Sequence, residues 1–184
     1  MKTYISILRG INVSGQKNIQ MSELKKAYEH LGLKNVITYI QSGNVIFQAD
    51  EKISDASLAE DIRNTILKKF KFEVPVILRK VSEWKKIISA NPLLKEKGID
   101  LERLHVTFLS MLPEKSKQQA VEQINYPPDR FLILGKEIYL HCPNGYGISK
   151  LSNNLFENKL KVTATTRNWR TVNSLLELAT SIGK

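Results

Sequence analysis

Basic and polar residues gather where an apolar, strand-like run of the sequence gives way to a helix-like one. The first such junction begins at Leu8 and reads LRGINVSGQKNIQM. Backbone N–H groups in a glycine-containing turn and at a helix N-terminus attract anions. Arg9 would add a bidentate donor and Lys17 a point charge. Alternatively, Arg9 forms a salt bridge with a neighbour and Gly10 only permits a sharp turn. The candidate ligand contacts at this junction are Arg9, Gly10, Asn12 and Lys17.

The spacing of the glycines excludes one familiar phosphate site. A P-loop needs the pattern G-x-x-x-x-G-K-[ST], in which the last hydroxyl binds magnesium. Here Gly10 and Gly15 are followed by Gln-Lys-Asn, so that hydroxyl is missing. The sequence therefore gives Arg9 no catalytic role, and an anion contact remains its candidate function.

The second junction reads NGYGISKLSNNLF and begins at Asn144. We expect Ser149 to cap a helix over residues 149–158, with Lys150 in its first turn. A cation there opposes the helix dipole by about 0.3–1 kcal/mol, and a bound anion would reverse that penalty. Alternatively, Lys150 points into water. The candidate contacts are Gly145, Gly147, Ser149 and Lys150.

The third junction reads TTRNWRTVNSLLELA. Asn168 is a good N-cap for a helix over residues 168–181, and Trp169 is large enough to anchor that helix. Two arginines flank the cap, and an arginine pair beside an indole could bind a nucleotide by ion pairing and stacking. Alternatively, the indole fills the core and the arginines lie on the surface. The candidate contacts are Arg167, Asn168, Trp169 and Arg170.

No arrangement of nucleophile, base and acid can be assigned from spacing, so the catalytic residues are unknown and an enzymatic activity is left open. The three histidines are scattered. We expect Cys142 to be a buried, inert thiol. No cluster of Cys, His and carboxylates predicts a metal site, and no cofactor is expected.

The net charge of +10 is the unusual bulk property of this chain of 184 residues. Residues 1–80 hold 13 basic and 8 acidic residues and residues 81–184 hold 15 and 10, so each part carries +5. Such a charge attracts polyanions, although a mildly basic surface explains it equally simply. No apolar run approaches the roughly 20 residues that span a bilayer, and no secretion signal is evident. With a single cysteine, a cytoplasmic location without membrane partners is expected.

The junctions must be positioned by the surrounding elements, which follow the order β-α-β-β-α-β twice. In residues 1–80 we expect a strand up to Leu8, a helix at 22–31, a hairpin at 36–40 and 45–47, a helix at 57–70 and an edge strand at 74–78 beside Pro75. Ser57 with Glu60 fits a capping box for the second helix.

Residues 81–103 are expected to form a helical connector. In residues 104–184 we expect strands at 104–109, 130–134, 137–141 and 162–165, and helices at 114–124, 149–158 and 168–181. The predicted fold class is therefore α+β, with two ferredoxin-like βαββαβ units in tandem and additional helices.

Taken together, LRGINVSGQKNIQMSEL, TYIQSGNVIF and TTRNWRTVNSLLELA resemble a bacterial family known as domain of unknown function 1697. The resemblance runs nearly end to end, and GYGISKL resembles a further family pattern. It departs slightly at Thr166, where the family often has Ala. The resemblance implies two ferredoxin-like units and no established activity. It also directs attention to the hairpin turn Gln41, Ser42, Gly43 and Asn44.

The leading hypothesis is a cytoplasmic binding protein for a phosphate-bearing ligand, either a nucleotide or a nucleic acid. One alternative is an enzyme acting on a small anionic substrate, with arginines stabilising charge. Another is a structural or protein-interaction module without a ligand. The sequence does not set the oligomeric state. The hypotheses differ in whether the polar junctions meet in space around a cavity.

Overall fold

The structure is a computed structural model of the chain, and it describes residues 1–13 and 15–182. It contains two units, one formed by Met1–Lys85 together with the segment from Leu175 onward and the other by Lys86–Ser174. Each unit contains one four-stranded antiparallel sheet, and six α-helices lie within the described residues. The protein is therefore of the α+β class.

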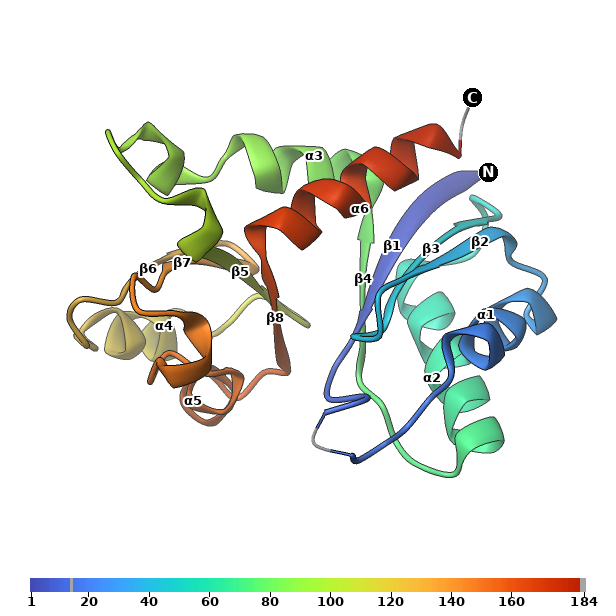
Figure 1. Cartoon of the computed structure of the whole chain (residues 1–184). Helices are drawn as coiled ribbons and strands as arrows, with labels where there is room; N and C mark the ends of the chain where they lie inside the picture. The colour runs from blue at the N-terminus through green and yellow to red at the C-terminus, as the bar shows by residue number, and fades with distance from the viewer. Residues whose placement is uncertain (14, 183–184) are drawn as a thin grey trace. The chain divides into compact units, whose positions relative to one another are not determined.

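The first unit follows the predicted order β-α-β-β-α-β (Figure 1). Its strands are ordered β2-β3-β1-β4, and every neighbouring pair is antiparallel. The strand that follows Pro75 lies at an edge of the sheet. This position was predicted because proline has no N–H to donate to a neighbouring strand. The elements are β1 (Lys2–Leu8), α1 (Met21–His30), β2 (Lys34–Tyr39), β3 (Asn44–Ala49), α2 (Asp55–Phe70) and β4 (Val76–Lys80).

Helices α1 and α2 cover the same face of this sheet (Figure 1). On α2, Leu58, Ile62 and Ile66 recur every four residues, so they share one face and are buried. Phe47 of β3 lies at the centre of the core, where its ring centroid is 5.7 Å from that of Tyr4 and 5.4 Å from that of Tyr28. The predicted cap of α2 was wrong by one turn. Ser54 is the N-cap, and its hydroxyl accepts a bond of 3.1 Å from the N–H of Ser57.

The second unit repeats both the order of elements and the order of strands, which is β6-β7-β5-β8. Its strands are β5 (Leu104–Leu109), β6 (Arg130–Leu134), β7 (Glu137–His141) and β8 (Ala164–Asn168), and its helices are α4 (Lys115–Glu122) and α5 (Asn153–Leu160). Three short 3-10 turns, η1 (Pro92–Lys95), η2 (Leu101–Arg103) and η3 (Tyr146–Ile148), complete the unit. The core under α4 and α5 includes Val121, Leu140 and Phe156.

The predicted start of α5 at Ser149 was wrong. The helix begins at Asn153, and its N-cap is Ser152, whose hydroxyl accepts from the N–H of Leu155 at 3.2 Å. Lys150 therefore precedes the helix and does not oppose its dipole.

Two further helices are α3 (Val81–Ser89) and α6 (Trp169–Ser181). The predicted N-cap of α6 is confirmed, because the side-chain oxygen of Asn168 accepts from the N–H of Thr171 at 2.8 Å. Among residues 1–13 and 15–182, no helix is long and apolar enough to cross a lipid bilayer.

Candidate functional site

The first junction and the hairpin turn after β2 meet within the first unit, and Asn12 joins them. Its side-chain amide nitrogen donates to the carbonyl of Gln41 at 2.8 Å and to that of Ile19 at 3.0 Å. Its side-chain oxygen accepts from the N–H of Ile19 at 2.8 Å. Asn12 has a φ of 54°, a left-handed conformation that asparagine tolerates better than most residues. All three bonds go to backbone groups, so Asn12 pins the loop to the turn.

Gly43 is required in the turn by both its conformation and its surroundings. It has a φ of 75°, and an added Cβ would lie 2.6 Å from Ile11 Cδ1 and 2.8 Å from Leu8 Cβ. Its carbonyl also accepts from the N–H of Leu8 at 2.9 Å. The neighbouring Asn44 is fully buried, and its side chain donates to the carbonyl of Tyr39 and to the hydroxyl of Ser42. The turn is therefore packed and internally bonded.

The cations of the first junction are not gathered around its cavity. A hollow of about 580 Å³ lies beside the start of α1, and its lining of Asn12, Asn18, Ile19, Gln20, Met21 and Gln41 contains no basic side chain. The ammonium of Lys17 instead donates to the carbonyl of Glu73 at 2.7 Å. The backbone N–H of Arg9 donates to the carbonyl of Pro75 at 3.0 Å. Gly10 has a φ of 72° with no atom near a would-be Cβ, so it serves the turn.

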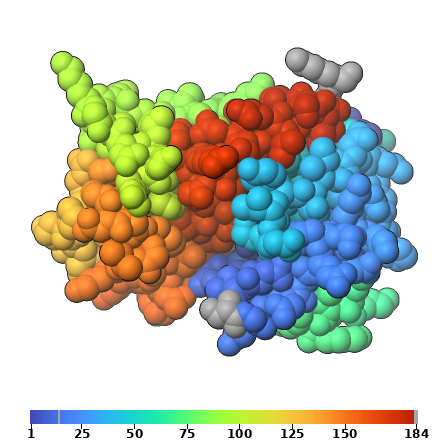
Figure 2. Space-filling view, viewed as in Figure 1, coloured from blue at the N-terminus to red at the C-terminus, as the bar shows by residue number. Residues whose placement is uncertain are grey.

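The second junction meets a different loop, the NYPPD segment, within the second unit. Ser149 donates its hydroxyl hydrogen to Asp129 Oδ2 at 2.6 Å and accepts from the N–H of Leu151 at 3.0 Å. Lys150 lies with its ammonium 5.3 Å from the ring centroid of Tyr126. Residues near 130 (yellow) and near 150 (orange) accordingly lie side by side at the surface (Figure 2).

These two loops enclose a hollow of about 330 Å³. One wall is the segment from Asn125 to Asp129, which contains a cis peptide between its two prolines. The other wall is formed by Asn144, Ile148 and Lys150, and Ile148 is 77% exposed. The hollow thus combines a cation, an aromatic ring and amide groups.

A second cation approaches the same loop from η2. Gly145 has a φ of 101°, and a Cβ there would lie 3.6 Å from Arg103 Nη1. Arg103 Nε lies 3.7 Å from Asp100 Oδ2, a long contact for an ion pair. By contrast, a Cβ on Gly147 would meet nothing within 4 Å. Sequence reasoning missed Arg103, Tyr126 and Asp129, and the cluster NYPPD was the signal that could have drawn attention to the last two.

The third junction is tied to the second by the hydroxyl of Thr166. That oxygen lies 2.6 Å from the hydroxyl of Thr107, accepts from the hydroxyl of Tyr146 at 2.9 Å and donates to Asn153 Oδ1 at 2.7 Å. Thr166 lies on β8. In this chain its hydroxyl connects β5, β8, η3 and α5.

Of the two interpretations of Trp169, the one in which the indole fills the core agrees with the structure, and nucleotide stacking does not. Its indole is 7% exposed, so it offers no free face to a base and fills the core. Arg167 is also buried, and its Nη1 donates to Thr165 Oγ1 and to the carbonyl of Thr166, both at 2.9 Å. Arg170 remains exposed in the first turn of α6.

A histidine and a cysteine near these loops have shifted pKa values. The ring of His105 stacks on that of Tyr146 with centroids 4.9 Å apart, and burial lowers the pKa of His105 despite a bond to the carbonyl of Arg103. Cys142 is fully buried, as predicted. Burial raises the pKa of the Cys142 thiol, and the nearby Asp129 adds to that rise, against a hydrogen bond with Ser149. Cys142 is therefore not suited to nucleophilic chemistry.

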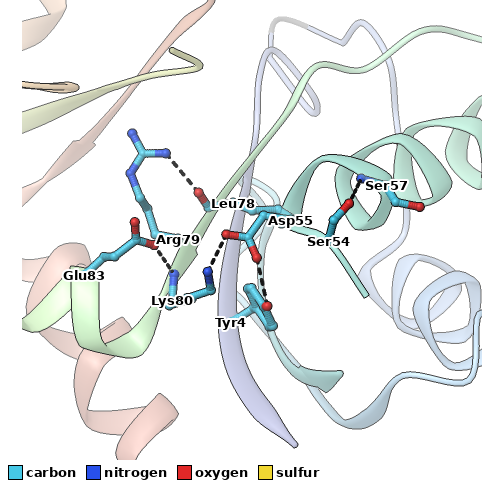
Figure 3. Close-up of polar contacts among 8 residues, drawn as sticks. All are labelled: Tyr4, Ser54, Asp55, Ser57, Leu78, Arg79, Lys80 and Glu83. Carbon is cyan, nitrogen blue, oxygen red and sulfur yellow. Dashed lines mark hydrogen bonds and ion pairs between the residues drawn. The ribbon is translucent and has the colours of Figure 1, made fainter. Parts of the chain in front are cut away.

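A polar cluster in the first unit was not anticipated from sequence (Figure 3). Asp55, at the start of α2, accepts from the hydroxyl of Tyr4 at 2.9 Å and from the ammonium of Lys80 at 2.6 Å. Burial and the Asp55 carboxylate raise the pKa of Tyr4 to about 12. Burial alone would raise the pKa of Asp55, but the bonds from Lys80 and Tyr4 outweigh it and lower that pKa. The cluster fastens α2 to β1 and β4.

In the part of the chain that the structure describes, no group of three or more His, Cys, Asp or Glu side chains is placed to hold a metal ion. The contacts described above place the polar junctions in two groups, one within each unit. The first is bonded internally, and the second surrounds a hollow that contains a lysine.

No match was found among curated proteins. Among solved structures, the chain is similar to the conserved bacterial protein SP0830 from Streptococcus pneumoniae, with a TM-score of 0.72 and 23% identity. The match covers 97% of this chain and 98% of that one, and it supports the fold. The family described as "Protein of unknown function (DUF1697)" matches residues 1–139, and this chain belongs to that family.

Proposed function

We propose that this protein binds a phosphate-bearing ligand, a nucleotide or a nucleic acid, at the loop that joins β7 to α5. One observation carries the proposal. The ammonium of Lys150 lies over the ring of Tyr126 at the wall of a hollow of about 330 Å³. A cation–π contact leaves the full positive charge in place. A cation beside an aromatic ring is the pair of groups with which proteins hold a phosphate and its base.

The surroundings of Lys150 add to this proposal. Arg103 approaches the same loop beside Gly145. Among the described residues that line the hollow, Asp129 carries the one carboxylate, and it accepts a hydrogen bond from the hydroxyl of Ser149. The second unit also has 13 basic and 8 acidic residues between positions 86 and 174, so its own charge is +5. A polyanion is attracted to such a unit before it makes any specific contact.

The alternatives fit other parts of the chain better than this loop. Asn12 and Gly43 support the structural reading of the first junction, because their contacts are intramolecular. An enzyme acting on a small anionic substrate would need a base or nucleophile near the cations. Of the candidates near this loop, Cys142 is fully buried with a raised pKa, and the ring of His105 is stacked on that of Tyr146. Binding without catalysis is therefore the function that we favour.

The proposal is tested by titrating the protein into fluorescein-labelled single-stranded DNA and RNA of 12 nucleotides at 25, 50 and 150 mM NaCl, with anisotropy as the readout. We expect affinity to fall steeply with salt. Lys150→Gln should lower the magnitude of the logarithmic salt slope by about 0.7, the value of one lost phosphate contact on a single strand. A parallel thermal-shift series with mononucleotides separates a small ligand from a polymer.

The matched control is Lys159→Gln, which removes the same charge from an exposed position at the end of α5. It should leave the salt slope close to that of the wild type. Equal effects of the two substitutions would mean that net charge alone attracts the oligonucleotide. The absence of binding to oligonucleotides and mononucleotides at 25 mM NaCl would refute the proposal outright.

We further propose that the two units are ferredoxin-like and arranged in tandem. Both have the order β-α-β-β-α-β, and in both the first strand lies between the third and the fourth. The division into residues 1–80, a connector at 81–103 and residues 104–184 remains a prediction. The lone cysteine, Cys142, supports a cytoplasmic location, where thiols stay reduced.

A further inference from the structure

The strand β6 (Arg130–Leu134) lies at the end of its sheet and has a neighbour on one side only. Its sequence, RFLIL, is almost entirely apolar, and Leu132 and Leu134 are 45% and 50% exposed. Edge strands of soluble proteins are normally protected by a charge, a proline or a bulge because they can pair with another chain. Apart from Arg130, β6 lacks these protections.

The hydrogen bonds at the two ends of the β5–β7 ladder reveal which backbone groups of β6 are open. The N–H of Leu109 donates to the carbonyl of Lys136 at 2.9 Å, and the N–H of Cys142 donates to the carbonyl of Arg103 at 3.0 Å. The pairs 109/136 and 103/142 continue the register of this ladder. The even-numbered residues of β7 therefore form the hydrogen bonds to β5. Antiparallel strands alternate between bonded and non-bonded pairs. Residues 137, 139 and 141 therefore bond β6.

Their partners on β6 are residues 134, 132 and 130. The N–H and C=O groups of the two remaining residues, Phe131 and Ile133, consequently point away from β7, toward the open edge. Their side chains meanwhile pack on the core of the unit. Two donors and two acceptors are thus presented in the spacing of a β-ladder, and only an extended chain matches that spacing.

A groove of about 570 Å³ lies beside this edge. Leu93 and Glu96, from η1 and its end, line one part of it, and the segment after α4 lines another. Phe131, Leu132 and Ile133 of β6 contribute apolar surface. The groove offers a second chain both backbone partners and apolar contacts.

The groove is acidic although the protein as a whole is basic. Its lining contains three carboxylates, Glu96, Glu122 and Asp129, and one cation, Arg130. Arg130 is already bound in a bidentate pair with Glu96, with distances of 3.1 and 2.7 Å. The described residues of the lining therefore include no further cation to balance the charges of Glu122 and Asp129. A partner that carries lysine or arginine beside apolar residues complements this surface.

We propose that β6 binds an extended peptide segment of alternating apolar and basic residues by adding it as a fifth strand to the sheet of the second unit. Four backbone hydrogen bonds to Phe131 and Ile133 would hold the strand, and the groove would select its side chains. A second copy of this chain is a poorer occupant, because two acidic grooves would face each other across paired β6 strands. This inference is independent of the phosphate-binding proposal.

The test uses a fluorescein-labelled peptide of eight residues with alternating Val and Lys, and anisotropy as the readout. We expect saturable binding by the full-length protein. Replacing Lys by Glu in the peptide should weaken binding at least ten-fold. N-methylation of alternate peptide bonds, which removes the N–H donors from one edge, should weaken it equally. Hydrogen exchange of the wild-type protein should slow at the amides of Phe131 and Ile133 when the peptide is added.

The matching protein variant is Ile133→Pro, which removes an N–H that β7 does not use and is therefore compatible with an edge strand. It should retain the wild-type circular dichroism spectrum and lose at least ten-fold in peptide affinity. Binding that survives both Ile133→Pro and N-methylation would overturn the proposal. The proposal would also be overturned if light scattering showed a dimer and the amides of Phe131 and Ile133 in that dimer were protected from hydrogen exchange without peptide. If Ile133→Pro does not fold, the N-methylated peptide and the exchange measurement on the wild type decide the matter.

Discussion

Replacing Gly43 by alanine tests whether the turn before β3 is a packing element or an exposed ligand contact. Two costs follow from the structure. Alanine at a φ of 75° is disfavoured by about 1–2 kcal/mol. The new Cβ would lie 2.6 Å from Ile11 Cδ1 and 2.8 Å from Leu8 Cβ. Ile11 can turn its terminal methyl away, but Leu8 Cβ is fixed to the backbone of β1, so the strand itself must shift.

Overpacking of this kind costs about 1–3 kcal/mol. The sum predicts that Gly43→Ala lowers the free energy of unfolding by about 2–5 kcal/mol. The control is Gly32→Ala in the same unit, where φ is 78° and nothing lies within 4 Å of the added methyl. Only the conformational cost of about 1–2 kcal/mol applies there. The difference between the two variants isolates the close approach of the turn to Leu8.

Urea unfolding followed by tryptophan fluorescence measures this difference. Trp84 belongs to the first unit and is fully buried, so its emission reports the loss of that unit. A Trp169→Phe background removes the signal of the second unit from every variant. Equal destabilisation by Gly43→Ala and Gly32→Ala would refute the packing argument. A Gly43→Ala protein of wild-type stability that no longer binds oligonucleotides would show instead that the turn contacts the ligand.

Three further predictions concern single side chains. Asn12→Ala removes three hydrogen bonds and leaves alanine at positive φ. In the same urea assay it should lower the free energy of unfolding by about 2–4 kcal/mol. A loss below about 0.5 kcal/mol would contradict the role of Asn12 in holding the loop to the turn. Asp55→Asn should cost at most about 1 kcal/mol at pH 7, because the ion pair with Lys80 is partly exposed. The pKa of Asp55 in the folded protein is lowered from 3.8, so the contribution of its carboxylate to stability is present above pH 3.8 and is lost as the pH falls further. Urea titrations at pH 7 and pH 3 should therefore show the difference in unfolding free energy between wild type and Asp55→Asn becoming smaller at pH 3. A difference that does not change with pH would contradict this linkage. Cys142 should resist a thiol-specific reagent such as DTNB in the native protein and react on unfolding, because it is buried with a raised pKa; rapid labelling of the folded protein would contradict this assignment.

The elements were predictable wherever local patterns settled them. The strands at 104–109, 130–134 and 137–141 have the predicted bounds, because β-rich runs there flank the clear turn at Gly135. The helix starts were less predictable. Serine is a good N-cap at several positions, and Ser54 and Ser152 were chosen over Ser57 and Ser149. The hydroxyl of Ser149 is instead bonded to Asp129, a partner 20 residues away that local reasoning cannot supply.

The candidate site illustrates the same limit. The sequence identified the loops that carry polar residues, but the partners of those residues come from distant segments. Asn12 bonds the carbonyl of Gln41 across 29 positions, and Arg103 approaches Gly145 from a turn that no motif marked. The motif around Trp169 was compatible with both a stacking residue and a core residue, and the structure shows a core residue. Spacing alone could not separate these cases.

The polar junctions consequently differ in what their polar atoms do, and that difference decides which of them can hold a ligand. At the first junction, the amide of Asn12 and the ammonium of Lys17 donate to backbone carbonyls, so a ligand would have to displace those bonds. At the second, the ammonium of Lys150 lies over an aromatic ring, a weak contact that leaves its positive charge available to an anion. A phosphate therefore gains most at Lys150, and this makes the loop between β7 and α5 the place to look for it.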